Sequence, residues 1–218
     1  SLDEQRTRYL QIKQAWDSKQ MDTVDRLMPT LHDYPLYPYL EYRQLAQNLD
    51  QETGLAVNDF IKRYPTLPPV RSLSSRFVNE LARRQDWRGL LVFSPQAPKP
   101  VAARCNWYYA KWATGQQQVA WDGAKAIWLT GSSLPGTCDK LFSAWQAAGQ
   151  QNPITTLERI RLAMKAGNSN LVNFLAKQLP EDYQTIANAV MDLQNNPGTV
   201  ENFARSVGAT DFTRQATA

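Results

Sequence analysis

Two segments of the chain carry the same pattern of cysteine and bulky apolar residues. In each segment the members stand at positions i, i+3, i+4 and i+7, and they are Cys105, Tyr108, Tyr109 and Trp112 in the first and Cys138, Leu141, Phe142 and Trp145 in the second. Side chains at this spacing lie on one face of an α-helix. The sequence therefore predicts two helices that bury equivalent faces.

A third helix is predicted between these two. Its apolar residues are Val119, Ala120, Ala124, Ile127 and Trp128, and it ends at Gly131 and the turn Ser-Ser-Leu-Pro-Gly. The two cysteines are 33 residues apart, and Gly115 and Gly149, which end the striped helices, are 34 apart. A period of this length is typical of tetratricopeptide-like helical hairpins. We therefore expect an all-α fold, a curved superhelical array of short helical hairpins that forms an α-solenoid.

The repeat is expected to bring the two cysteines together. In such an array the first helices of successive hairpins pack side by side, and both cysteines open a buried helix face. We predict a disulfide between Cys105 and Cys138, and the alternative is a pair of reduced, buried thiols. Closing a loop of this size stabilises a fold by roughly 3–4 kcal/mol. A disulfide also favours an oxidising compartment.

Composition fits a helical chain that does not cross a membrane. Hydrophobic residues make up 43% of the 218 residues, which excludes a disordered chain, and only 10 glycines argue against a turn-rich β fold. No apolar run approaches the roughly 18 residues of a membrane span, and the first residues, SLDEQRTRYL, lack the apolar core of a signal peptide. The net charge of +4 suits an acidic polymer as a partner, but no dense block of Lys and Arg indicates nucleic acid.

Helical periodicity continues on both sides of the striped region. Before this region it predicts a first helix that ends near residues 18–20, helices over 22–31 and 55–64, a helix that begins at Tyr39, and helical structure within 72–93. After this region it predicts a helix over 153–166 that ends at Gly167, and helices over 171–179 and 182–193. The tail, 196–218, also reads as short helices and lacks a stop signal, so we expect the chain to be cut inside a longer array. The proline-rich connector SPQAPKP, residues 94–100, is the candidate seam within one superhelical domain of residues 1–218.

The most basic stretch lies just before that connector. It contains five arginines, Arg71, Arg76, Arg83, Arg84 and Arg88, and only Glu80 and Asp86 offset them. Guanidinium groups hold carboxylates bidentately, so these arginines are candidate substrate-binding residues. The alternative is a solvated helix face. The aromatic side chains of the stripes can stack on sugars, but their spacing favours a buried core.

Common catalytic and metal sites find no support in the sequence. His32 is the only histidine, so a three-histidine metal site is excluded, and the cysteines are too far apart for a zinc motif. His32 stands beside Asp33, but no nucleophile elbow completes a Ser-His-Asp triad and no glycine-rich phosphate loop occurs. We therefore expect no catalytic residue, metal or cofactor in this chain.

Several stretches resemble a known family. They are DYPLYPYLEYRQL, PTLPPVRSLSSRFVNELARRQDWRGLL, YYAKWATGQ, CDKLFSAW, LERIRLAMKAGN and GATDFTRQ. Together they are similar to the N-terminal superhelical region of the large soluble lytic murein transglycosylases of enterobacteria. The resemblance implies a periplasmic protein whose U-shaped helical array continues into a ring and precedes a lysozyme-like catalytic domain. It also implies cleavage of the MurNAc–GlcNAc bond of peptidoglycan by one glutamate, with formation of a 1,6-anhydro sugar.

One part of the family pattern is absent. In the family the catalytic glutamate is followed by serine and accompanied by a Gly-Leu-Met-Gln stretch, and neither occurs here. The expected function is therefore a non-catalytic scaffold that positions peptidoglycan strands for a catalytic domain in the remainder of the parent chain. The alternative is a helical-repeat module that recruits a cell-wall partner protein.

Overall fold

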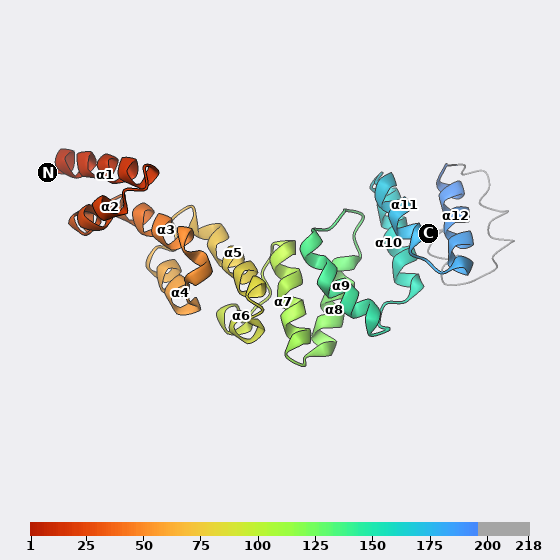
Figure 1. The fold of residues 1–218 in the computed structure, drawn as a ribbon. Helices are drawn as coiled ribbons and strands as arrows, with labels where there is room; N and C mark the ends of the chain where they lie inside the picture. The colour runs from red at the N-terminus through yellow and green to blue at the C-terminus, as the bar shows by residue number, and fades with distance from the viewer. Residues whose placement is uncertain (196–218) are drawn as a thin grey trace. The chain divides into compact units, whose positions relative to one another are not determined.

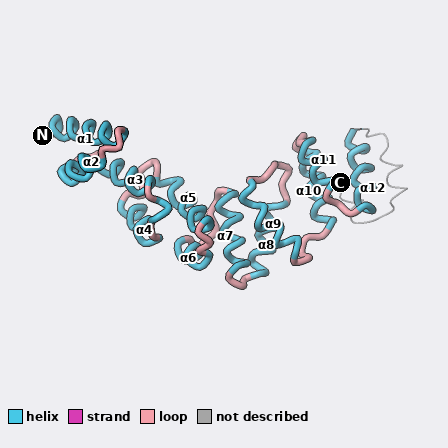
Figure 2. Tube along the Cα trace, in the orientation of Figure 1, coloured by secondary structure: helices cyan, strands magenta, loops and turns pink. Residues whose placement is uncertain are grey.

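The computed structural model describes residues 1–195, which fold into helices connected by loops, without a β-strand (Figure 1, Figure 2). The twelve α-helices are α1 Leu2–Asp17, α2 Met21–Leu27, α3 Tyr37–Gln47, α4 Gly54–Arg63, α5 Val70–Arg83, α6 Trp87–Phe93, α7 Val101–Ala113, α8 Gln117–Trp128, α9 Asp139–Ala147, α10 Pro153–Lys165, α11 Ser169–Lys177 and α12 Glu181–Asn195. Three short 3-10 helices accompany them, η1 Met28–Leu31, η2 Leu49–Gln51 and η3 Gly136–Cys138. The predicted all-α array of short helices is confirmed. Within the described residues no helix is long and apolar enough to cross a membrane.

The chain divides into two compact units, residues 1–80 and the residues from 81 onward, with the boundary inside α5. In the first unit α1 and α2 pack as a hairpin and η1 packs on both. The core of this hairpin consists of Ile12, Ala15, Trp16, Val24, Met28, Leu31 and Leu40. Pro29 lies in η1, where the α-helix gives way to a 3-10 helix.

A polar network joins α3 to the end of α4 in the first unit. Arg63 Nη1 donates to Glu41 Oε2 at 2.9 Å, and the Tyr64 hydroxyl donates to Glu41 Oε1 at 2.9 Å. Arg63 Nε also donates to Asp59 Oδ2 at 2.9 Å. Burial, reinforced by the hydrogen bond to Glu41, raises the pKa of the Tyr64 hydroxyl. Glu41 is thus the shared acceptor of this network.

In the second unit α7 and α8 form a hairpin, α6 packs on α7, and α9 packs on both helices of the hairpin. The disulfide between Cys105 of α7 and Cys138 at the end of η3 joins these elements, with its Cα atoms 5.0 Å apart. The predicted disulfide is confirmed, and the alternative of two free thiols is wrong. Both cysteines are fully buried.

The next hairpin is formed by α10 and α11, and α12 packs on both. One core runs through all these helices, and its larger members include Trp121, Trp128, Leu141, Trp145, Leu157, Ile160, Leu171 and Leu175. The Trp128 ring centroid lies 5.0 Å from that of Phe142 and 5.9 Å from that of Trp145. These edge-on aromatic contacts link α8 to α9.

The two predicted stripes are not buried to the same depth. All four members of the second stripe, from Cys138 to Trp145, are buried. In the first stripe only Cys105 is buried, whereas Tyr108, Tyr109 and Trp112 are half-buried and Asn106, Trp107 and Ala110 occupy the core. Tyr108 and Trp112 nevertheless pack against the core, so the two stripes differ in depth and not in the face that they bury. The reason is that α6 and residues 94–100 cover another face of α7, where Trp107 Nε1 donates to Ser94 O at 2.8 Å.

Five helix ends share one turn geometry. The residue that leaves the helix has a positive φ at Lys19, Gln85, Gly115, Gly149 and Gly167, with angles of 59°, 59°, 91°, 72° and 72°. In each turn the next residue donates its N–H to a carbonyl five residues earlier, as Gln20 does to Ala15 and Asn168 to Ala163. This is the Schellman arrangement. The predicted helix ends at Gly115, Gly149 and Gly167 are confirmed.

Two predictions stay open. The helices predicted for 196–218 lie outside the residues that the structure describes. The connector at 94–100 lies in the second unit and stays a prediction as a domain seam.

Candidate functional site

The five arginines predicted to bind substrate lie on α5 and α6. Arg71, Arg76, Arg83 and Arg88 are exposed, and Arg84 is half-buried. Arg71 and Arg76 belong to the first unit, and Arg83, Arg84 and Arg88 belong to the second. With about 100° between successive residues, Arg71 lies about 140° from Arg76 around α5. The helix therefore presents these side chains on more than one face.

Some of these arginines already have partners. Arg76 Nη1 donates to the Tyr42 hydroxyl at 2.6 Å, and Arg83 and Arg84 interact with other residues as well. Their role in substrate binding stays a prediction.

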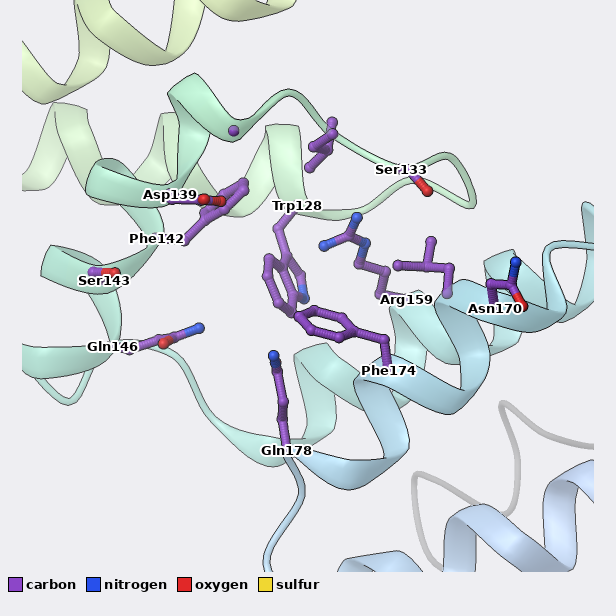
Figure 3. Close-up of a pocket in the computed structure, with 13 residues that line it drawn as sticks. Trp128, Ser133, Asp139, Phe142, Ser143, Gln146, Arg159, Asn170, Phe174 and Gln178 are labelled. Atoms are coloured by element: carbon purple, nitrogen blue, oxygen red, sulfur yellow. The ribbon is translucent and has the colours of Figure 1, made fainter.

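A different set of side chains lines an open pocket in the second unit (Figure 3). The pocket has a volume of about 580 Å³ and is bounded by α8, α9, α10, α11 and the loop that follows α8. α9 contributes polar side chains that include Asp139 and Gln146, and α11 contributes Asn170 and Phe174. Figure 3 shows these two walls on opposite sides, with Arg159 and Trp128 between them.

Arg159 of α10 is the most unusual residue of this pocket because it is a charged side chain that is only 4% exposed. Its Nε donates to Thr130 O at 3.3 Å and its Nη2 donates to Ser132 O at 3.1 Å. The guanidinium carbon lies 4.5 Å from the centroid of the Trp128 ring, a cation–π geometry. Arg159 therefore ties α10 to α8 and to the loop that follows it.

No carboxylate neutralises this buried charge among residues 1–195. The hydrogen bonds of Arg159 go to neutral backbone carbonyls, and it forms no ion pair there. Burial alone lowers the pKa of the Arg159 guanidinium to about 10, because removal from water disfavours the charged form. The side chain is still protonated at neutral pH. The pocket thus has a cationic floor for which residues 1–195 supply no counter-ion.

Asn168 helps to hold the loop that forms one edge of the pocket. Its Nδ2 donates to Gly131 O at 3.3 Å, and its Oδ1 accepts the N–H of Leu171 at 3.3 Å as the N-cap of α11. One amide therefore fixes both the loop and the start of the pocket wall. Phe174 projects from that wall and is 59% exposed.

Sequence reasoning did not identify Arg159 as a site residue. Leu157, Ile160 and Met164 form the apolar stripe of this helix, and Arg159 lies about 160° from Leu157 around the helix axis. That position predicts an exposed side chain. In the structure Thr155, Thr156 and Arg159 are buried as well as Leu157 and Ile160, so α10 is covered on more than one face. No pattern in the sequence marks this second covered face.

His32, the single histidine, lies in the first unit and is exposed. Its Nδ1 is 3.1 Å from Asp33 Oδ1, a contact between neighbours in a turn. Within the described part of the chain no group of three or more His, Cys, Asp or Glu side chains is placed to hold a metal ion.

The whole chain is similar to part of a known enzyme. It is 64% identical over 218 residues to the soluble lytic murein transglycosylase of Escherichia coli strain K12, covering 100% of this chain and 34% of that protein. It is 63% identical over 215 residues to the protein of the same name from Salmonella typhimurium, of which it covers 33%. This chain spans about one third of the length of the soluble lytic murein transglycosylases that it matches. The resemblance found in the sequence is confirmed, and no family model matches the chain.

Solved lytic transglycosylase structures show the same fold. The crystal structure of the 70 kDa soluble lytic transglycosylase from Escherichia coli matches 99% of this chain with a TM-score of 0.85, and this chain covers 35% of that one. The complex of the 70 kDa enzyme with bulgecin A matches equally well, with a TM-score of 0.85 and 64% identity. A lytic transglycosylase from Pseudomonas aeruginosa, solved as an inactive mutant, matches 96% of this chain with a TM-score of 0.81 at 27% identity, and this chain covers 34% of it. The helical arrangement therefore persists where the sequences have diverged.

Proposed function

We propose that this chain is a non-catalytic scaffold and peptidoglycan-positioning region of a soluble lytic murein transglycosylase in the periplasm. The observation that carries the proposal is the 64% identity along its whole length to an enzyme of which it spans about a third. The parent protein would cleave the MurNAc–GlcNAc bond and release 1,6-anhydromuropeptides. The partners of this region would be glycan strands and the remainder of the parent chain, including its catalytic domain.

Charge supports a role in substrate positioning. The chain carries a net charge of +4, and the side chains of Arg76 and Arg83 are exposed. Peptidoglycan strands carry carboxylates on their peptide stems. A basic surface raises the local concentration of such an acidic polymer, and salt weakens this attraction.

The proposal is tested by sedimentation of the purified 218-residue chain with isolated sacculi. We expect binding at low salt that weakens as sodium chloride is added. The double variant Arg76→Gln, Arg83→Gln should bind several-fold more weakly. The control Arg6→Gln, Arg26→Gln removes the same charge from exposed positions on α1 and α2 and should lose less. Absence of binding at low salt, or equal losses in the two double variants, would contradict the proposal.

Exposed apolar side chains favour the alternative, a module that recruits a cell-wall partner protein. Leu55 is 86% exposed and Val92 is 80% exposed, and each stands on an outer helix surface. A photo-crosslinking amino acid placed at either position in periplasmic extracts should then capture one defined protein. Capture of a protein by a chain that does not sediment with sacculi would replace the scaffold proposal with this one.

A further inference from the structure

We propose that the pocket between α9 and α11 binds a short peptide with a free carboxylate, which Arg159 receives on the floor while Phe174 covers the ligand from the wall (Figure 3). The inference rests on the proposed function, since it takes the peptide to be a stem peptide of peptidoglycan. It assigns a binding site to a part of the chain that carried no predicted site residue.

The first reason is the charge of the floor. A buried guanidinium without a carboxylate costs free energy, because the charge loses its hydration and gains no ion pair in return. Among the described residues Arg159 engages only Nε and Nη2, and both donate to backbone carbonyls. Its Nη1 makes no hydrogen bond there, so two N–H groups are left for a ligand oxygen. A bound carboxylate supplies the missing negative charge and a charge-assisted hydrogen bond.

The second reason is the balance of charge in the lining. Among the described residues that line the pocket, Arg159 is the one cation and Asp139 the one anion. Asp139 is exposed on the opposite wall and forms no ion pair within residues 1–195. A dianion such as phosphate would be repelled by this carboxylate. A peptide with both a carboxylate and an ammonium group matches the two charges.

The third reason is the chemistry between these charges. Gln146, Asn170 and Gln178 line the pocket with side-chain amides, each of which offers two donors and one acceptor. That set matches the N–H and C=O groups of a peptide. The exposed ring of Phe174 adds an apolar surface at the rim. A volume of about 580 Å³ lies in the usual range of small-ligand pockets, so a few residues of peptide fit.

Titration calorimetry with the 218-residue chain tests the inference directly. The probe is alanyl-γ-glutamyl-diaminopimelate, which has free carboxylates and two ammonium groups. Its carboxylate-amidated form and the neutral sugar chitotetraose are the comparisons. We expect the tripeptide to bind and its amidated form to bind at least tenfold more weakly. Chitotetraose should give no heat of binding.

Variants separate a ligand role from a purely structural one. Arg159→Gln and Phe174→Ala should each weaken tripeptide binding at least fivefold. Arg161→Gln, which removes an exposed charge from the same helix, should change it less than twofold. Phe174 is an exposed rim residue and decides the matter if Arg159→Gln does not fold. Equal affinity of the amidated tripeptide, or unchanged binding by Phe174→Ala, would overturn the inference.

The outcome is distinguishable from that of the proposed function. If the chain sediments with sacculi but does not bind the tripeptide, the pocket inference fails and the scaffold proposal stands. If the tripeptide binds as expected but sacculi do not, the scaffold proposal fails and the pocket remains a carboxylate-peptide site.

Discussion

At the residue scale, Lys19 and Gln85 adopt the positive φ that glycine adopts at other helix ends of this chain. Both have φ values of 59°, in the left-handed region that costs roughly 1–2 kcal/mol for a residue with a Cβ atom. At Gly115 and Gly167 the same turn has no such cost. In all four turns the next α-helix begins two residues later. The tight connection between neighbouring helices therefore determines the backbone, and the residue type only modifies its energy.

Lys19→Gly is expected to stabilise the first unit by about 0.5–1 kcal/mol. The substitution removes the strain of the left-handed residue, and part of this gain is lost because glycine increases the entropy of the unfolded chain. Urea unfolding followed by circular dichroism measures the change. Gln11→Gly, at an exposed position inside α1, is the control and should destabilise by about 1 kcal/mol. A loss of stability in both variants would contradict this account of the turn.

At the element scale, the α7–α8 hairpin depends on a close approach at Gly123. A Cβ atom at this position would lie 2.3 Å from ring carbons of Tyr108. Glycine inside a helix normally costs about 1 kcal/mol relative to alanine. Because Gly123 has no side chain, the Tyr108 ring can lie against α8. Helix packing therefore outweighs helix propensity.

Gly123→Ala is expected to destabilise the chain by about 1–3 kcal/mol, because the new methyl group overpacks the hairpin by more than the propensity gain returns. A double-mutant cycle with Tyr108→Ala checks the cause. When the ring is absent, Gly123→Ala should be neutral or stabilising, so the two substitutions should be strongly non-additive. Additive losses in the cycle would show that the ring is not the obstacle.

At the scale of the whole molecule, each compact unit has its own core. The hairpin core of the first unit includes Ile12 and Leu31, and the core of the second unit extends from Cys105 to Val190. In helical arrays each layer contacts mainly its neighbours, so stability is a sum of local terms. The disulfide lies entirely within the second unit.

Replacing both cysteines, Cys105→Ala with Cys138→Ala, is expected to lower the stability of the second unit by roughly 3–4 kcal/mol, since the bridge closes a loop of 33 residues. Hydrogen exchange measured by mass spectrometry should show faster exchange in α7, α8 and α9. Exchange in α1 and α2 should stay the same. Equal acceleration in both units would contradict the independence of their cores.

Helical periodicity and helix-stop residues predicted much of this fold. The helices, the ends at Gly115, Gly149 and Gly167, and the pairing of Cys105 with Cys138 all follow from local spacing and a 33-residue repeat. These features can be predicted from the sequence because every α-helix has the same period and ends at a small set of residue types. Tertiary structure alone decided which further faces are covered. It buried Arg159 between α8 and the loop after it. The physical reason is that burial of a second helix face depends on which distant segment packs there, and periodicity along one helix contains no record of that neighbour.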